Sequence, residues 1–290
     1  MMRVLVTGAR GQLGSDVVAE LERRSAERTR SRGFEVIASD VPELDITDRD
    51  TVMTAFSTYE PSLVLHLAAF TAVDACETER DRAWSVNALG TRHVVEAARL
   101  VGAHVTYLST DYVFDGTLDR PYTEWDEPNP LSMYGRSKLA GEHEIGADGL
   151  IVRTSWLVGR HGANMVKTVL ALMAGDGPLR FVADQRGSPT VAHDLARTLV
   201  SLSLERRSGL FHVTNQGTTS WFGFACAVVE AAGGDATRVE PISTDELVPP
   251  RPAPRPRNSV LDNTALRLSG MALLPDWRQS VGALVQELIA

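Results

Sequence analysis

Short apolar runs alternate with amphipathic helical patterns through the first half of the chain. The runs predict strands at Arg3–Thr7, Phe34–Ser39, Leu63–Leu67, His104–Leu108 and Leu150–Arg153. Between them, the spacing of apolar residues predicts helices at Gln12–Glu22, Thr51–Tyr59, Arg82–Val101 and Tyr134–Ile145. Most of the strand runs are apolar throughout, as in a parallel sheet covered on both faces. We therefore expect an α/β protein with a Rossmann-type, doubly wound parallel sheet.

The second half has a less regular pattern. It predicts helices at Ala163–Met173, His193–Leu204, Phe222–Ala232 and Trp277–Ile289, and short strands at Leu179–Val182 and Leu210–Val213. We expect residues 1–150 to form one domain and residues 151–290 a smaller, mixed α/β region partly interleaved with it. Pro249–Arg257 alternates Pro with Arg, and this composition favours a flexible or polyproline-like surface segment.

The net charge, the cysteine count and the length of the apolar runs argue against several classes of protein. A net charge of −8 gives no overall electrostatic argument for a nucleic-acid partner. Cys76 and Cys226 are too few for a disulfide framework and lack metal-ligand spacing. The first apolar run is too short for a signal peptide, and no run approaches the roughly 18 residues of a membrane span. We expect a cytoplasmic protein without a membrane partner.

A glycine-rich turn links the first predicted strand to the first helix. Gly8, Gly11 and Gly14 are separated by two residues in each gap, with Gln12 and Leu13 opening the helix. Such a turn lets the backbone approach a pyrophosphate, and the helix N-terminus offers N–H groups to that anion. Although glycine turns are common, this one lies in the first βα unit, which predicts a dinucleotide site in residues 1–150. The spacing is typical of short-chain dehydrogenases.

Asp40 ends the second predicted strand, where a carboxylate can accept hydrogen bonds from the adenosine ribose and repel a 2′-phosphate. It favours NADH over NADPH, although Arg10 in the glycine turn could supply a counter-charge. The alternative is a plain turn residue. Asp40 lies further beyond the glycine turn than the usual 20 or so residues. The polar insertion Arg23–Gly33 accounts for the extra length. Further cofactor contacts are expected at the carboxyl edge of the sheet, from Asp45, Ile46, Ala68 and Ala69.

Tyr134 and Lys138 lie four residues apart in a predicted helix and therefore share one face. A nearby ammonium favours the phenolate form, which should lower the Tyr134 pKa and make the phenol a usable proton donor. Alone, the pair could equally be a surface Tyr and an exposed Lys. However, Thr110 and Asp111 end the fourth strand, where Thr110 can donate to a substrate carbonyl. The three motifs together predict one oxidoreductase site.

The sequence resembles the dTDP-4-dehydrorhamnose reductases, a branch of the extended short-chain dehydrogenase/reductase superfamily. The first glycine motif is shared by the whole superfamily, whereas later segments are more specific to this branch. The resemblance is nearly end to end and includes Thr7–Gly14, Leu44–Thr47, Ala68–Asp74, Ser109–Gly116, Tyr134–Glu142, Arg153–Trp156, Asp184–Thr190 and Arg255–Ser259.

The resemblance implies NADH- or NADPH-dependent reduction of the 4-keto group of dTDP-4-dehydro-L-rhamnose to dTDP-L-rhamnose. It implies a triad of Thr110, Tyr134 and Lys138, with the last two also contacting the cofactor. Substrate contacts are implied for Thr110, Asp111 and Trp156, and less directly for Asn164 and Arg255. It would also place the Pro/Arg stretch beside the nucleotide pocket. Some members form a magnesium-bridged dimer, so a homodimer stays open, and no residue is assigned to a metal.

Three other interpretations stay open. An epimerase or dehydratase on the same fold would keep Tyr134 and Lys138 but usually needs further acid–base residues. A reductase of another dTDP-4-keto-sugar would differ only in pocket shape. A non-catalytic, cofactor-binding regulatory subunit is a different class, against which the intact triad argues. Trp156 itself could be a core residue rather than a pocket residue.

The assignment of Tyr134 as the acid leads to a direct prediction. Tyr134→Phe keeps the ring but removes the proton, so kcat should fall on the order of 10²–10⁴-fold, the usual contribution of a general acid. Cofactor affinity, measured by titration, should stay nearly unchanged. Near-wild-type kcat would remove Tyr134 from the acid role.

Overall fold

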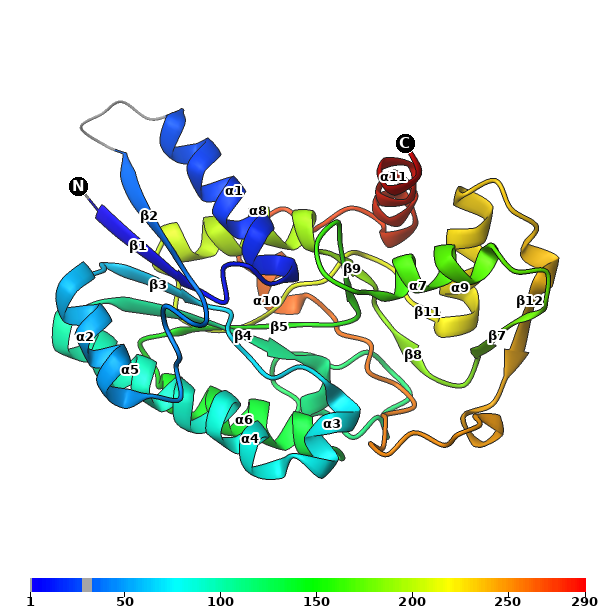
Figure 1. Cartoon of the computed structure of the whole chain (residues 1–290), viewed down its shortest axis with the longest axis horizontal. Coiled ribbons are helices and arrows are strands. Elements are labelled where there is room, and N and C mark those ends of the chain that lie inside the picture. The colour runs from blue at the N-terminus through cyan, green and yellow to red at the C-terminus, as the bar shows by residue number, and fades with distance from the viewer. Residues whose placement is uncertain (1, 28–32) are drawn as a thin grey trace.

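The computed structural model describes residues 2–27 and 33–290. A six-stranded parallel sheet forms its centre, in the order β10-β5-β4-β3-β1-β2. The chain runs outward from β1 to β2, then returns to the other side of β1 for β3 and its successors (Figure 1). This reversal confirms the expected doubly wound fold. The strands are β1 (Met2–Thr7), β2 (Phe34–Ser39), β3 (Leu63–His66), β4 (His104–Thr110), β5 (Leu150–Thr154) and β10 (Gly209–His212).

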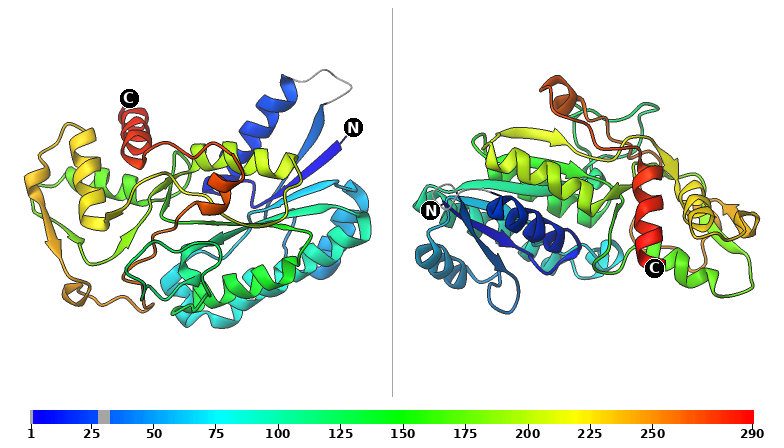
Figure 2. Two further views of the ribbon diagram at one scale, coloured as in Figure 1. Left: turned by 180° about the vertical axis from the view of Figure 1, so that it is seen from behind. Right: turned by 90° about the horizontal axis from the view of Figure 1, so that it is seen from above.

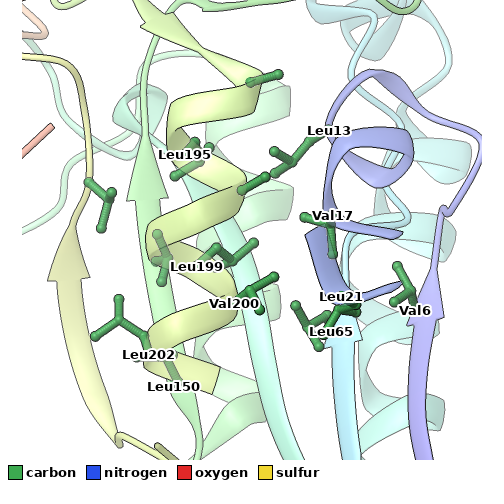
Figure 3. Packing of buried hydrophobic residues seen from close by; sticks show 14 of the residues in the cluster. Val6, Leu13, Val17, Leu21, Leu65, Leu150, Leu195, Leu199, Val200 and Leu202 are labelled. Atoms are coloured by element: carbon green, nitrogen blue, oxygen red, sulfur yellow. The ribbon is translucent and has the colours of Figure 1, made fainter. Parts of the chain in front are cut away.

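Helices cover both faces of this sheet (Figure 1). One face carries α1 (Gln12–Ala26) and α8 (Ala192–Leu204), and the other carries α2 (Arg49–Tyr59), α5 (Thr91–Val101) and α6 (Met133–Ile145). Val17 and Leu21 of α1 point toward α8, where Leu199 is equally buried (Figure 3). Burying each such side chain contributes about 1.5–3 kcal/mol. The pairing of α1 with α8 therefore ties residues after 190 to the first βα unit.

A second hydrophobic cluster lies beyond the carboxyl ends of the strands (Figures 1 and 2). Phe224 and Trp277 are fully buried in it. It is formed by α7 (Met165–Met173), α9 (Trp221–Ala231), α11 (Trp277–Ile289) and the parallel pair β7 (Leu179–Val182) and β12 (Val239–Ile242). The sequence pattern missed β12 because its Glu and Pro interrupt the apolar run. Shorter elements are α3 (Val73–Thr78), α4 (Arg80–Trp84), β6 (Leu157–Val158), β8 (Arg186–Gly187), β9 (Thr190–Val191), β11 (Thr219–Ser220) and α10 (Thr264–Leu268).

The predicted helix at Arg82–Val101 is present but is not uniform. It runs as α4, a π-helical segment Ser85–Gly90, and α5. Such π segments are rare and often occur at functional sites. The polar insertion Arg23–Gly33 begins in helix α1, and residues 28–32 of it lie outside the described part of the chain.

The expectation of a flexible surface segment at Pro249–Arg257 is wrong for its second half. Ala253 is 3% exposed, and the side chain of Arg255 is 8% exposed against Asp74. Specific contacts, which composition does not reveal, hold this segment against the sheet domain. Across residues 2–27 and 33–290, no helix is long and apolar enough to cross a membrane.

Candidate functional site

A cavity of about 650 Å³ lies at the carboxyl edge of the central sheet. It is lined by the turns that follow β1 to β5, by the start of α6 and by the start of α9. Most residues singled out from the sequence meet here, although they come from distant parts of the chain. Those lining the cavity are Gly8, Gly11, Gln12, Leu13, Gly14, Asp40, Asp45, Ile46, Ala68, Ala69, Thr110, Asp111, Tyr134, Lys138 and Trp156.

The glycine turn forms a cradle that fits a pyrophosphate. Gly8 has φ +69°, and a Cβ there would lie only 2.7 Å from the backbone nitrogen of Ala68. Gly11 is the N-cap residue of α1, and no side chain of the described residues caps that helix. The first N–H groups of α1 therefore face the cavity without an internal partner, as an anion site requires.

Asp40 is held in place by backbone donors at the end of β2. Its two carboxylate oxygens accept hydrogen bonds from the N–H groups of Arg10 and Val41, each at 2.9 Å. The Arg10 guanidinium turns away to Glu43, with an N–O separation of 2.6 Å. The Arg10 guanidinium, which could have balanced a 2′-phosphate, is therefore paired with Glu43. The preference for NADH expected from Asp40 stays a prediction.

Tyr134 and Lys138 are buried at the start of α6, at 9% and 3% exposure. Ser132 starts the helix by accepting a hydrogen bond from the Gly135 N–H. Burial raises the pKa of Tyr134, whereas the interaction with the Thr110 hydroxyl lowers it by a smaller amount. The expectation of a lowered Tyr134 pKa is therefore wrong, because desolvation of the phenolate outweighs other effects. The phenol keeps its proton at neutral pH and is ready to donate it.

The Lys138 side chain packs against an aromatic ring and forms no ion pair with any residue that the structure describes. Its Nζ lies 4.1 Å from the centre of the Tyr107 ring. Burial lowers the pKa of Lys138 to about 7, although the negative charge of Glu142 works in the opposite direction. The protonation of Lys138 therefore changes near neutral pH and is sensitive to charges placed close to it.

A buried ion pair joins α6 to β5, the strand that precedes Trp156. Glu142 and Arg153 are joined by two hydrogen bonds at 2.6 and 2.8 Å, and both side chains are 4% exposed. The Ser109 hydroxyl also donates to Glu142. Glu142 lies one helical turn beyond Lys138, so this pair sets the position of the helix that presents both Tyr134 and Lys138.

Asn87 was missed by the sequence reasoning. It lies in the π-helical segment and is 1% exposed. Its amide nitrogen donates to the Phe70 carbonyl and the Ser137 hydroxyl, both at 3.0 Å, and its oxygen accepts from the Phe70 N–H at 2.8 Å. It joins the turn after β3 to α6 directly behind Lys138. A π segment has no reliable sequence signal, which explains the omission.

Trp156 follows β5 and is not a core residue. It lines the cavity, and its indole stacks on Trp221 with ring centres 3.6 Å apart and planes 6° apart. Trp156 adopts φ +45°, an uncommon conformation for a bulky residue. Gly187 permits this position, because a Cβ there would collide with the indole. Trp221 was also missed, since nothing in its local sequence places the start of α9 beside β5.

Asn164 and Arg255 do not line the cavity. The Asn164 side chain accepts from the Lys167 N–H and donates to the Gly159 carbonyl, so it serves as the N-cap of α7. This cap explains why the helix predicted from Ala163 begins at Met165. Arg255 forms two hydrogen bonds with Asp74, at 2.8 and 3.0 Å, and reaches toward Tyr112, a cavity residue.

No cluster of three or more His, Cys, Asp or Glu side chains suited to a metal occurs within the described ranges. The residues that line the cavity suit two kinds of chemistry. Its glycine turn and Asp40 suit a dinucleotide, and its Thr110, Tyr134 and Lys138 wall suits proton transfer to a carbonyl oxygen.

Comparisons with known proteins agree with this geometry. The RmlD substrate binding domain family matches residues 2–290. The chain is 41% identical to a dTDP-4-dehydrorhamnose reductase of Streptomyces griseus, covering 96% of this chain and 91% of that protein. It is 38% identical to the spore coat polysaccharide biosynthesis protein SpsK of Bacillus subtilis, covering 99% and 98%. A structure of dTDP-4-dehydrorhamnose reductase from Bacillus anthracis in complex with NADP superposes with a TM-score of 0.89, at 38% identity over 99% and 100% of the two chains.

The Trp156–Trp221 stack predicts a binding defect without loss of fold. Trp156→Phe removes the indole N–H and part of the stacked surface, so KM for a sugar nucleotide should rise about 5–20-fold, equivalent to roughly 1–2 kcal/mol. Tm should change little. The matched control is Trp277→Phe in the second hydrophobic cluster, which should lower Tm while leaving KM unchanged. A large Tm loss in Trp156→Phe with normal KM would assign it a packing role instead.

The Arg10–Glu43 pair predicts a shift in cofactor preference. The wild-type protein should have the higher kcat/KM with NADH. Glu43→Gln releases the Arg10 guanidinium toward a 2′-phosphate, so the NADPH/NADH ratio of kcat/KM should rise severalfold. Glu35→Gln, which removes an exposed carboxylate from β2, the strand that precedes Asp40 and Glu43, is the control and should leave the ratio unchanged. A strong NADPH preference in the wild type would overturn the Asp40 argument.

Proposed function

This chain belongs to the RmlD substrate binding domain family, and we propose that its cavity is the active site of a dTDP-4-dehydrorhamnose reductase. The reaction is the NAD(P)H-dependent reduction of the 4-keto group of dTDP-4-dehydro-L-rhamnose to dTDP-L-rhamnose. The observation that carries the proposal is the meeting of Thr110, Tyr134 and Lys138 on one wall of a cavity that also contains the dinucleotide cradle. Relatives at 38–41% identity over nearly the whole chain support it.

The residues of the cradle fit a nicotinamide dinucleotide. The glycine turn and the N-terminus of α1 would hold the pyrophosphate, and Asp40 would accept from the adenosine ribose. Asp45, Ile46, Ala68 and Ala69 would line its path along the carboxyl edge of the sheet. When bound, the reduced nicotinamide supplies a hydride to the carbonyl carbon of the substrate.

Thr110, Tyr134 and Lys138 form one wall of the cavity, called here the catalytic wall, and this wall would supply the proton. Tyr134 is buried and protonated, and we assign it as the donor to the 4-keto oxygen. Thr110 would hydrogen-bond to the same oxygen and orient it. Lys138 would contact the cofactor ribose and, when charged, stabilise the phenolate that the reaction leaves on Tyr134.

The substrate side is proposed from Trp156 and Asp111, which line the cavity, and from Arg255, which lies outside it against the cavity residue Tyr112. The stacked indoles offer an apolar face to a sugar ring. Arg251 and Arg255 repel each other beside Tyr112, with Asp74 as the carboxylate that pairs with Arg255. Two guanidinium groups with one carboxylate leave excess positive charge, which suits the diphosphate of a sugar nucleotide. Asn164 acts only by fixing α7, next to the cavity residue Ala163.

The test is turnover against a panel of dTDP-4-keto-sugars. NADH or NADPH consumption should be fastest with dTDP-4-dehydro-L-rhamnose, and the product should be dTDP-L-rhamnose by NMR. Faster turnover of a different 4-keto-sugar would reassign the substrate. No oxidation of either cofactor with any sugar, together with tight cofactor binding, would favour the non-catalytic regulatory role.

A further inference from the structure

Glu77 is a partly buried carboxylate that contacts the helix of Tyr134 and has no role in the reduction described above. It lies in α3, and 17% of its side chain is exposed. One carboxylate oxygen accepts a hydrogen bond of 2.7 Å from the backbone N–H of Met133. The other lies 3.9 Å from the Arg80 guanidinium, which is too far for a hydrogen bond. The close partner of this carboxylate is therefore a backbone group of another helix.

Met133 is the first residue of α6 and immediately precedes Tyr134. The N–H groups at the start of a helix have no carbonyl partner within it and need an acceptor from elsewhere. Ser132, the N-cap residue, accepts from the Gly135 N–H, and Glu77 accepts from the Met133 N–H. A charged acceptor gives the stronger bond, and its negative charge suits the positive end of the helix dipole. Glu77 is thus a second cap of α6, supplied from 56 positions earlier in the chain.

Two neighbouring segments contact the first turn of α6. One is the turn after β4, because a Cβ at Gly135 would collide with the Tyr112 carbonyl. The other is α3, whose Cys76 belongs to the same small buried cluster as Tyr134. Packing contacts of this kind allow small shifts, whereas a hydrogen bond restricts both distance and direction. The Glu77 hydrogen bond therefore fixes the start of α6 more narrowly than the packing around it does.

Proton transfer from Tyr134 depends on where this first turn lies. A displacement of about 1 Å can slow a reaction on the order of 10²-fold, even when the altered residue lies away from the reacting atoms. We propose that Glu77 is a positioning residue for the reduction: by holding the Met133 N–H, it keeps the Tyr134 phenol within reach of a substrate carbonyl beside Thr110. This inference rests on the proposed function. Glu77 does not line the cavity, so it acts through the backbone of α6.

Three substitutions separate the acceptor from its charge. Glu77→Gln keeps the length and an acceptor oxygen, Glu77→Asp keeps the charge but is one methylene shorter, and Glu77→Leu keeps neither. Measured well below Tm, kcat should fall about 10–100-fold in Glu77→Asp and Glu77→Leu, because the phenol is displaced. Glu77→Gln should retain most of the wild-type kcat. In all three variants, KM for the sugar nucleotide and the Kd of the cofactor should stay within about twofold of the wild type, since only the transition state depends on the phenol.

The matched control is Glu96→Leu, which removes a helical carboxylate that binds Arg49 and does not line the cavity. It should leave both kcat and KM unchanged. A wild-type kcat in Glu77→Leu, with or without a lower Tm, would make Glu77 a structural cap only and overturn the proposal. Equal losses of kcat in Glu77→Gln and Glu77→Leu would also overturn it, because the charge rather than the acceptor would then matter. A KM that rises as much as kcat falls would assign Glu77 to substrate binding instead.

A measurement without substrate tests the hydrogen bond itself. The chain has 7 methionines, so labelling them with nitrogen-15 gives few amide signals in NMR spectra, and the signal that Met133→Leu removes belongs to Met133. Exchange of this amide with deuterated solvent should be at least about 10-fold faster in Glu77→Asp and Glu77→Leu than in the wild type or Glu77→Gln, because the first turn opens more often.

Equal exchange in the wild type and the two defective variants would overturn the proposal. Glu77→Asp, which keeps a charged side chain, decides the point if Glu77→Leu does not fold. If the wild-type protein reduces none of the sugars, the proposed function fails, and the exchange rates still decide whether Glu77 holds the start of α6.

Discussion

The buried pair of Glu142 and Arg153 connects the elements that make the catalytic wall. Glu142 is on α6, Arg153 is on β5, and Ser109 on β4 adds a third hydrogen bond. Ser109 and Arg153 are also direct neighbours in the sheet. Removing one partner of such a buried pair typically costs 3–5 kcal/mol, because the other charge is left unpaired. The position of Tyr134 relative to Thr110 depends on this contact, since the same helix and strands carry both.

Burial shifts the pKa of several ionisable groups near the Glu142–Arg153 pair. Desolvation keeps Tyr134 protonated and brings Lys138 and Asp111 to a pKa of about 7. It also lowers the pKa of His66 to about 3, and this neutral imidazole bridges Thr7 and Thr91 beneath the wall. Groups that are neutral, or that change protonation near neutral pH, suit a site that must deliver a proton to its substrate.

The cavity depends on both hydrophobic clusters. The sheet core carries the glycine turn and Tyr134, whereas the second hydrophobic cluster carries Trp221 and supports the segment that contains Trp156. The Pro/Arg segment then returns to the sheet domain, where Arg255 meets Asp74. The cavity thus lies where the two hydrophobic clusters meet, and such a boundary is a common location for ligand sites.

The sequence by itself determined the parallel sheet, its glycine cradle and the pairing of Tyr134 with Lys138. These features depend on local periods: continuous apolar strands, glycine spacing before a helix, and a four-residue interval on one helix face. The strands at Phe34–Ser39 and Leu179–Val182 and the helix at Trp277–Ile289 were predicted with their observed bounds, since each is bounded by clear polar or turn residues.

Only the tertiary structure decided which distant side chains meet and how they ionise. The Trp156–Trp221 stack, the Asn87 contacts and the Arg255–Asp74 pair join segments separated by tens to hundreds of positions. The direction of the Tyr134 pKa shift followed burial rather than its spacing from Lys138. Local sequence fixes the period and direction of a side chain, whereas desolvation and contact depend on everything packed around it.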